Sequence, residues 1–294
     1  MINFTKHRNK YLIFSGSLIL ISLFAVIFFG LNFGIELAGG SIMEVGYEEN
    51  RPPIEEVRSS LAELDLGEFQ VQEIDDDAFL IRTTETDEDL YGEIMSVLEG
   101  AEQRYFESVG PTVGRELRNT TIIAMILASV LVIIYIAFAF SGSSGPVSSW
   151  QYGTTATVIA FFHDVLIIIG IFAILGNFKG VQFTIPVAVA LLTTLGYSLN
   201  DTVVIFDRIR ENINRAGGKF NEVVNESLNQ TLTRSINTSL TTLLVLLAIL
   251  FFGGETLFYF ILALVLGVVL GTYSSIFLAS SLLLFWKERI DKVR

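Results

Sequence analysis

Long runs of apolar residues alternate with short polar segments over most of the chain. A membrane-spanning helix needs roughly 20 apolar residues to cross a hydrocarbon layer of about 30 Å. Six runs approach or exceed this length: residues 11–31, 121–140, 154–175, 183–206, 235–252 and 257–286. Lys6, Arg8 and Lys10 precede the first run, but its apolar region is too long for a signal peptide and five runs follow. We therefore expect an α-helical polytopic membrane protein with six transmembrane helices.

The segment between the first two runs has the periodicities of a folded domain. It predicts a strand, a helix, two strands and a second helix over residues 41–47, 52–66, 68–74, 78–83 and 86–106. An Asp-rich turn, 75–77, joins the paired strands, and Thr86 or Asp87 is a suitable N-cap for the second helix. The order βαββα predicts a small α+β, ferredoxin-like domain over residues 32–118.

Two glycine-rich segments connect this domain to the spans. They are "GIELAGGS" at 34–41 and "SVGPTVGREL" at 108–117. Glycine permits tight backbone turns and proline fixes one. The segments are either simple connections or a pair of hinges, and their turn-forming residues are Gly34, Gly39, Gly40, Gly110, Pro111 and Gly114.

Composition agrees with a membrane protein and excludes several functions. Of the 294 residues 51% are hydrophobic, and the mean hydropathy is +0.58. The absence of cysteine excludes a disulfide scaffold or a thiolate metal site, and only two histidines, His7 and His163, are present. No nucleotide-binding or metalloprotease motif occurs. We therefore expect no cofactor, no metal, no nucleic acid partner and no covalent chemistry.

Charge predicts the topology. Residues 32–118 hold 22 of the 31 acidic and 6 of the 19 basic residues, so this segment has a net charge of −16. The rest of the chain has a net charge of +4, which gives −12 for the whole chain. Lys and Arg collect in the termini, 1–10 and 287–294, and in the predicted loop 207–234. Basic residues mark the cytoplasmic side, so both termini are expected there and the acidic domain outside. Its acidity indicates a solvated exterior or, alternatively, a surface for a basic partner.

Asp201 lies inside the fourth run, where a carboxylate costs about 2.5–3.5 kcal/mol on insertion scales. Arg234 begins the fifth run at a similar depth, and an Asp201–Arg234 ion pair is expected. Asn200 precedes the aspartate, and other polar residues continue the two helix faces. These supporting residues are Thr194, Tyr197 and Ser198 on the fourth run and Asn237 and Thr238 on the fifth.

His163 and Asp164 form a second ionisable cluster near the centre of the third run. An imidazole beside a carboxylate is suited to proton transfer, because histidine titrates near neutral pH. The alternative for both aspartates is a structural role in which hydrogen bonds tie helices together. In the sixth run, Gly267, Gly271 and Ser275 recur every four residues, a pattern typical of close helix packing.

Six ordered motifs resemble those of SecF, the smaller membrane subunit of SecD–SecF protein-export complexes, which is related to the RND transporter superfamily. They are "LNFGIELAGGS", "SVGPTVGREL", "FFHD", "YSLNDTVVIFDRIRE", "TLTRSINTSLTTLL" and "GTYSSIF". The resemblance implies a six-span bundle with one outer domain, pairing with SecD, and action beside a SecYEG-type channel. It also implies that Asp201 and Arg234 belong to a proton pathway completed by SecD.

The expected function is therefore a subunit that, with SecD, uses the proton motive force to draw translocating polypeptide through the Sec channel of the cytoplasmic membrane. One alternative is a passive subunit that stabilises the Sec complex. The other is part of an RND-type small-molecule exporter, for which the 87 residues of the outer segment are too few to form a porter region.

Overall fold

The computed structural model describes residues 2–48, 51–64, 66, 69–74, 77–84, 90–140, 148–216 and 219–293. They form two compact units, which we describe separately. One contains residues Met1–Asn32 and Ile123–Arg294, and the other contains Phe33–Ile122. Some of the predicted features lie outside the described residues. They are the turn at 75–77 (apart from Asp77), the cap at Thr86 or Asp87, and residues 141–147, which precede the third span.

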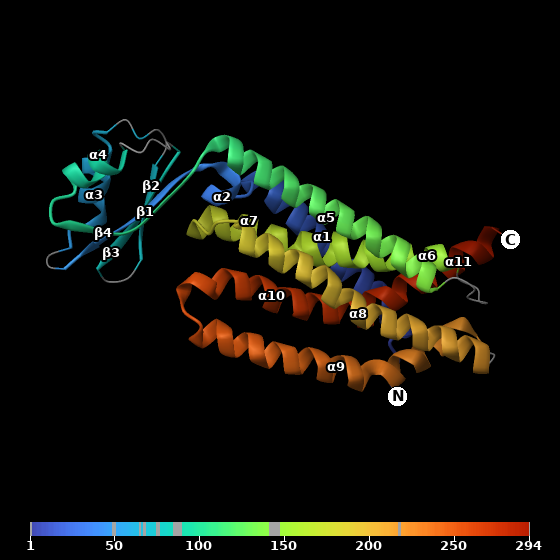
Figure 1. Ribbon diagram of the computed structural model, residues 1–294. Coiled ribbons are helices and arrows are strands. Elements are labelled where there is room, and N and C mark those ends of the chain that lie inside the picture. The colour runs from blue at the N-terminus through green and yellow to red at the C-terminus, as the bar shows by residue number, and fades with distance from the viewer. Residues whose placement is uncertain are drawn as a thin grey trace. The chain divides into compact units, whose positions relative to one another are not determined.

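The first unit is a bundle of long helices (Figure 1). The α-helices are α1 (Arg8–Phe29), α5 (Pro111–Ala139), α6 (Ser149–Thr157), α7 (Leu166–Lys179), α8 (Ile185–Ala216), α9 (Phe220–Phe252), α10 (Glu255–Tyr273) and α11 (Ala279–Val293). A 3-10 turn, η1 (Thr5–His7), precedes α1, and two π-helical segments, η2 (Val158–Val165) and η3 (Ser274–Leu278), complete the third and sixth spans.

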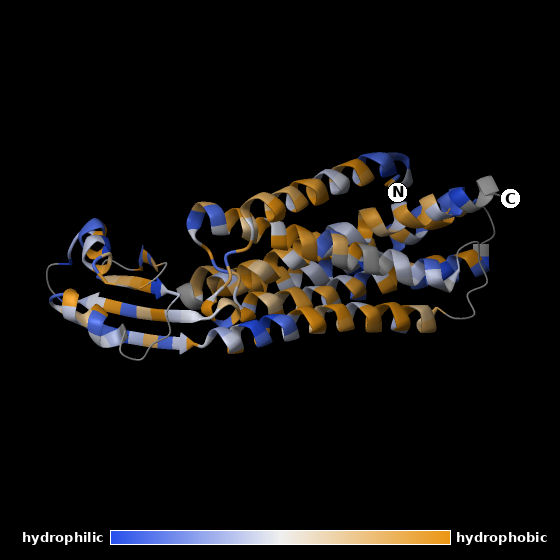
Figure 2. Cartoon of the chain, turned by 90° about the horizontal axis from the view of Figure 1, so that it is seen from above, coloured by the Kyte–Doolittle hydropathy of each residue, from blue (hydrophilic) through white to orange (hydrophobic). Residues whose placement is uncertain are grey.

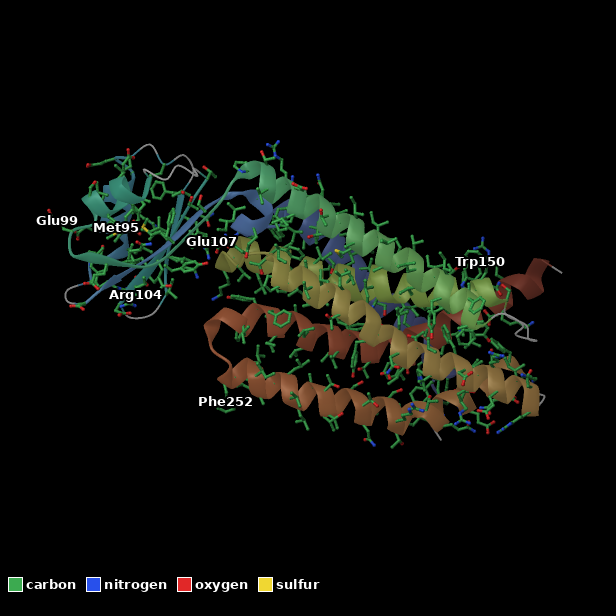
Figure 3. The ribbon with its side chains drawn as sticks, viewed as in Figure 1. Met95, Glu99, Arg104, Glu107, Trp150 and Phe252 are labelled. Atoms are coloured by element: carbon green, nitrogen blue, oxygen red, sulfur yellow. The ribbon has the colours of Figure 1, made fainter. Side chains whose placement is uncertain are left out.

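Within the described part of the chain, six helices are long and apolar enough to cross a membrane. Apolar residues dominate the middle of the helices and polar residues gather toward their ends (Figure 2). Trp150 and Phe252 lie at opposite ends of the bundle (Figure 3) and are exposed, as suits aromatic residues near membrane–water interfaces. The predicted six-span helical fold is confirmed.

The loop predicted at 207–234 is wrong, because most of it is helical. α8 continues to Ala216 and α9 begins at Phe220, so the two helices form a hairpin that extends beyond the apolar runs. Asn212 Nδ2 donates to Ser227 Oγ at 2.9 Å and to Gln230 Oε1 at 2.9 Å across this hairpin. These polar contacts between antiparallel helices stabilise helix where hydropathy alone ends the span.

α8 is the central helix of the bundle. It packs against α9, α10, η2 and η3, and more than half of its span is buried. By contrast, most residues of the α1, α5 and α9 spans face outward. Outward apolar side chains are favourable in lipid, so these three helices form the outer layer and α8 carries the residues that the protein encloses.

The second unit is an antiparallel four-stranded sheet with two helices on one face (Figure 1). Its strands are β1 (Gly40–Tyr47), β2 (Phe69–Glu73), β3 (Ala78–Thr83) and β4 (Ala101–Val109), in the order β2-β3-β1-β4. The helices are α3 (Ile54–Leu61) and α4 (Leu90–Val97). Alternate residues of β1 and β3 meet the helices in one core that includes Met43, Val45, Val57, Leu61, Phe79, Ile81, Ile94 and Leu98.

The second predicted helix of this domain ends earlier than expected. α4 stops at Val97, and the residues assigned to its continuation form β4, which pairs with β1. Gly100, with φ +75°, reverses the chain between them in a conformation that residues with a Cβ rarely adopt. The ferredoxin-like α+β class is confirmed, and the element order is βαββαβ instead of βαββα.

The two glycine-rich segments pack against each other. The short helix α2 (Ile35–Ala38), with Gly34 at its N-cap, leads into β1, and β4 leads through Gly110 into α5. A Cβ on Gly39 would lie 2.7 Å from the Pro111 Cα, and one on Gly114 would lie 2.6 Å from the Gly39 nitrogen. The two segments therefore form one packed joint, which we call the glycine joint. Gly39 and Gly114 allow its close backbone contact because neither has a Cβ.

Candidate functional site

Asp201 is enclosed at the interface of three helices. Its side chain, on α8, is 4% exposed. Ser239 Oγ, on α9, donates a long hydrogen bond of 3.4 Å to Asp201 Oδ2, and Thr272 Oγ1, on α10, donates to Ser239 Oγ at 2.6 Å. Ser239 and Thr272 also line an otherwise apolar cavity of about 370 Å³ between the fifth and sixth spans. The carboxylate therefore meets neutral hydroxyl groups.

The predicted Asp201–Arg234 ion pair does not form in this structure. Arg234 is exposed, and it influences Asp201 as a nearby positive charge without contacting it. The contacts of Asn212 with Ser227 and of Asp201 with Ser239 set the register of α8 and α9. This register places Arg234 level with Phe206, about 7 Å along the axis from Asp201. Arg234 is thus displaced along the helix from Asp201, and its side chain is exposed.

The face of α9 that meets α8 is a stripe of small hydroxyl residues that the sequence analysis missed. Its members recur every four residues and are all buried: Ser227, Thr231, Ser235 and Ser239. The polar face predicted from Arg234, with Asn237 and Thr238, is exposed. The recurrence of small residues every four positions is the same signal that was recognised in the sixth run, and it could have identified this face.

Asp164 lies in a second enclosed cluster, with an exposed fraction of 0% for both it and His163. His163 Nδ1 lies 2.7 Å from Asp164 Oδ1. The other carboxylate oxygen, Oδ2, accepts hydrogen bonds from Ser198 Oγ of α8 and, at 3.0 Å, from Ser274 Oγ of η3. The pair predicted from sequence therefore connects three spans.

The imidazole of His163 has one free ring nitrogen. Its Nε2 is buried and has no hydrogen-bond partner among the described residues, and the ring stacks on Tyr273 with centroids 5.9 Å apart. The geometry thus provides a carboxylate and an imidazole that can share or exchange a proton.

Three residues of the Asp164 cluster lie in π-helical turns of the third and sixth spans. Asp164 and His163 belong to η2, and Ser274 is the first residue of η3. Short π-helical segments within α-helices are rare and occur often at functional sites, because they redirect side chains at the cost of regular hydrogen bonding. Nothing in the residue periodicity predicts them.

The small residues predicted on the sixth span, Gly267, Gly271 and Ser275, are all in close contact with α8. A Cβ on Gly267 would clash with Thr194, and one on Gly271 would lie 3.0 Å from the Ser198 Cβ. Ser275 Oγ lies 2.8 Å from Thr202 Oγ1 and donates to the Ser198 carbonyl at 3.0 Å. The small-residue stripe of the sixth span therefore packs directly on α8.

Tyr197 and Asn200 are two predicted residues that lie outside the Asp201 cluster. The Tyr197 hydroxyl is buried without a hydrogen-bond partner in the described part of the chain. Asn200 is exposed and lines a cavity of about 300 Å³ between α5 and α8, on a different face from Asp201. No group of three His, Cys, Asp or Glu that could hold a metal ion occurs among the described residues.

Comparisons with known proteins agree with this architecture. A family model described as the C-terminal part of the protein export membrane proteins SecD and SecF matches residues 92–289. A model of the SecD/SecF GG motif matches residues 24–50, which include the packed pair Gly39 and Gly40. Together these matches cover the glycine joint, part of the four-stranded sheet domain and the polar clusters of the bundle.

The protein translocase subunit SecF of Thermobaculum terrenum is 42% identical over 306 residues, which cover 98% of this chain and 95% of that protein. SecF of Desulfurispirillum indicum is 38% identical over 310 residues, covering 98% and 92%. The crystal structure of SecDF from Thermus, described as a translocon-associated membrane protein, has a TM-score of 0.84 and 35% identity. That match covers 98% of this chain and 39% of the SecDF chain.

A second SecDF structure, in a super-membrane-facing form, matches with a TM-score of 0.71 and 34% identity over 99% of this chain. The chain spans 39% of each SecDF chain but nearly all of the SecF subunits. The family match, the full-length relatives and the shared fold agree, and the chain belongs to the SecF family of protein translocase subunits.

Proposed function

We propose that this chain acts with SecD to couple the proton motive force to polypeptide translocation through a SecYEG-type channel. It does so without covalent chemistry, by taking up and releasing protons on Asp201 and on the His163–Asp164 pair. One elementary charge crossing 100 mV supplies about 2.3 kcal/mol, which is enough to bias a conformational equilibrium.

One observation carries this proposal. Asp201 and Asp164 are both buried in the spans, and neither contacts a Lys or Arg within the described residues. A buried carboxylate without a cation is stabilised most simply by taking up a proton, because an isolated charge in a medium of low polarity costs several kcal/mol. Such a group can alternate between charged and neutral states, whereas a tightly ion-paired one stays charged.

The exposed polar face of α9 supports a membrane partner. Arg234, Asn237 and Thr238 are exposed on α9, a helix that spans the membrane. Polar groups at this depth are unfavourable in lipid and instead face protein or water. The SecDF match leaves 61% of the SecDF chain uncovered, and SecD is the partner that we propose for this face.

We also propose the cytoplasmic membrane as the location, with both termini in the cytoplasm and the acidic domain outside. The N-terminal segment, the α8–α9 hairpin and the C-terminal segment carry the Lys and Arg residues that mark the cytoplasmic side. The acidic unit is inserted after the first span, so an odd number of crossings separates it from the N-terminus.

Protein export in a strain or vesicle system that depends on this chain tests the function. We expect Asp201→Asn to assemble with SecD and lose the stimulation of export that requires the proton gradient. Asp207→Asn is the matched control, because it makes the same change to an exposed carboxylate on the same helix. Normal stimulation in an assembled Asp201→Asn complex would reject the proposal.

A passive stabilising subunit is the second candidate, and the α8 contacts favour it. Thr194, Ser198 and Thr202 each face the small-residue stripe of the sixth span, so part of the polar content of α8 serves helix packing. A purely structural role predicts that neutral variants of the aspartates fail to assemble with SecD. Assembly measured by co-purification therefore separates the two candidates.

A further inference from the structure

The "GTYSSIF" segment, residues 271–277, lies between the two buried aspartates. Thr272 and Ser274 are two residues apart on the sixth span and project toward different neighbours. Thr272 contacts Ser239 of α9, which contacts Asp201, and Ser274 contacts Asp164 of η2 directly. One turn of the sixth span is thus connected to Asp164 directly, through Ser274, and to Asp201 through Thr272 and Ser239.

Ser274 has one hydroxyl hydrogen and two acceptors. Its Oγ lies 3.0 Å from Asp164 Oδ2 and 3.1 Å from the Gly271 carbonyl oxygen of its own helix. A charged carboxylate is the stronger acceptor, because charge-assisted hydrogen bonds are about twice as strong as neutral ones. When Asp164 is neutral this advantage is lost, and the hydrogen turns to the Gly271 carbonyl.

Thr272 has the same choice on the other side of the helix. Its Oγ1 lies 2.6 Å from Ser239 Oγ and 2.7 Å from the Val268 carbonyl oxygen. Donation to Ser239 occupies an acceptor position of that hydroxyl and directs the Ser239 hydrogen toward Asp201 Oδ2. A neutral Asp201 no longer favours this series of hydrogen bonds, so Thr272 donates to the Val268 carbonyl of its own helix instead.

We propose that Thr272 and Ser274 are positioning residues through which one turn of the sixth span senses the charge of both Asp201 and Asp164. Each hydroxyl bonds outward when its aspartate is charged and back to its own helix when the aspartate is neutral. The proposal rests on the proposed function, in which these aspartates exchange protons, and it adds that the two proton-binding sites are coupled.

The π-helical segment gives this coupling a structural basis. η3 begins at Ser274, and the Gly271 carbonyl that Ser274 can bond lies in the turn before it. Hydroxyl groups that bond back to helix carbonyls alter and bend helices. A change at Ser274 therefore alters the turn that also holds Thr272, so a proton on one aspartate changes the hydrogen-bond partners offered to the other.

Few other charged or titratable groups face these sites. His163 contacts Asp164 from its own element, and Tyr273 stacks on His163 and accepts from Ser15 Oγ of α1 at 3.4 Å. From α8, Tyr197 lies next to Ser198, and from α9, Arg234 acts on Asp201 at a distance. None of these groups contacts Thr272 or Ser274 through a hydrogen bond in the described residues.

The test is the pH profile of proton flux in vesicles that contain the full chain with SecD. Ser274→Ala removes a donor from charged Asp164, so its half-maximal flux should move to higher pH by about one unit, a tenfold change or about 1.4 kcal/mol. Thr272→Val removes the hydroxyl without changing shape and should shift the profile in the same direction. Ser274→Thr keeps the hydroxyl and should restore the original profile.

Ser280→Ala is the matched control. Ser280 is buried on the same span, and within the described part of the chain its hydroxyl bonds only to the Ile276 carbonyl, at 3.1 Å. Its profile should coincide with that of the unmodified chain. In the Thr272→Val/Ser274→Ala double variant, coupled sites give a shift that differs from the sum of the single shifts, whereas independent sites give the sum.

Single-variant profiles that coincide with Ser280→Ala, or shifts that add in the double variant, would overturn the proposal. If Ser274→Ala does not assemble with SecD, Thr272→Val decides alone, and an unshifted profile rejects it. Asp201→Asn, measured in parallel, separates this inference from the proposed function. Flux lost in Asp201→Asn with unshifted hydroxyl variants rejects only the coupling, whereas flux retained in Asp201→Asn rejects the function itself.

Discussion

At the scale of single residues, the partners of the buried aspartates determine what they can do. A contacting guanidinium would hold a carboxylate in its charged form and make release of that contact expensive. Asp201 instead meets Ser239, and Asp164 meets two serines and a histidine. Hydroxyls can donate to a charged carboxylate and accept from a neutral one, so both protonation states retain hydrogen bonds.

Close helix contact at the residue scale gives a prediction about stability. A Cβ on Gly170 of α7 would lie 2.5 Å from the Ser22 Cβ and 2.6 Å from the Ser22 Cα of α1. Gly170→Ala must therefore separate the two helices, and we expect it to destabilise the protein by about 1–3 kcal/mol. Thermal unfolding of the full chain in detergent measures this effect.

Gly16→Ala on α1 is the control for that experiment, because a Cβ there meets nothing within 4 Å. Alanine has a higher helix propensity than glycine, so this variant should be as stable as the unmodified protein or slightly more stable. Equal melting temperatures for the Gly170 and Gly16 variants would show that α1 and α7 are not in close contact.

The key charged residues could be predicted from sequence, but their partners could not. Asp201, Asp164 and His163 are recognisable because ionisable groups are rare in apolar runs. Arg234 was assigned the right helix and the wrong face, since a helix rotates by about 100° per residue and sequence alone does not show which face meets α8. Ser239 was missed because a single serine in a span is ordinary, and only its four-residue spacing from Ser227, Thr231 and Ser235 marks the buried face of α9.

At the scale of elements, the four-stranded sheet domain shows why β4 was predicted as helix. β4 is an edge strand, and its side chains are at most half-buried, so it lacks the alternation of apolar and polar residues that marked β1 and β3. The helical pattern of the preceding residues continued into it without a contrary signal. Gly100 is the residue that separates the two elements.

Two glycines of this region should respond in opposite ways to the same substitution. Gly100→Ala forces a Cβ into a backbone with φ +75° and should destabilise the domain by about 1 kcal/mol. Gly92→Ala lies within α4, where a Cβ meets nothing within 4 Å, and should stabilise it by up to about 1 kcal/mol. Amide hydrogen exchange of β1 and α4 in the full chain reports both changes.

The opposite outcome has a clear meaning. If Gly100→Ala leaves exchange unchanged, the reversal before β4 does not require a left-handed backbone. Gly92→Ala is the matched comparison, because it adds the same methyl group to a glycine that has no positive φ.

At the scale of the whole molecule, the ends of the chain and the α8–α9 hairpin lie together at one end of the bundle. Arg8 forms a bidentate ion pair with Glu288, with N–O distances of 2.6 and 2.9 Å. Phe4 N donates to Asn225 Oδ1 at 2.8 Å, and Asn229 bonds both the nitrogen and the carbonyl of Ile2. These contacts unite the three basic regions from which the orientation was predicted.

Site-specific labelling tests the orientation. The chain contains no cysteine, so single-cysteine variants need no background substitutions. Lys6, Lys219 and Glu99 are exposed and lie in the N-terminal segment, the hairpin and the outer domain. A membrane-impermeant maleimide should label Lys6→Cys and Lys219→Cys only from the cytoplasmic side and Glu99→Cys only from outside. Labelling of all three from one side would contradict the proposed topology.

The number of spans and the position of the sheet domain in the sequence, after the first span, followed from run lengths, because the thickness of the hydrocarbon layer fixes the length of a spanning helix. The length of α8 and α9 beyond the membrane did not, since polar contacts such as Asn212 with Ser227 replace apolar burial there. The π-helical turns at Asp164 and Ser274 depend on packing between distant spans and leave no local pattern.

The central claim, that Asp201 carries protons, is tested most directly by proton flux into vesicles that contain this chain with SecD. The complex must first be shown intact by co-purification in each variant. We predict that flux falls to the background of empty vesicles in Asp201→Asn and persists in Asp207→Asn, which changes an exposed carboxylate of the same helix. Flux that persists in an intact Asp201→Asn complex would contradict the account and assign Asp201 a structural role.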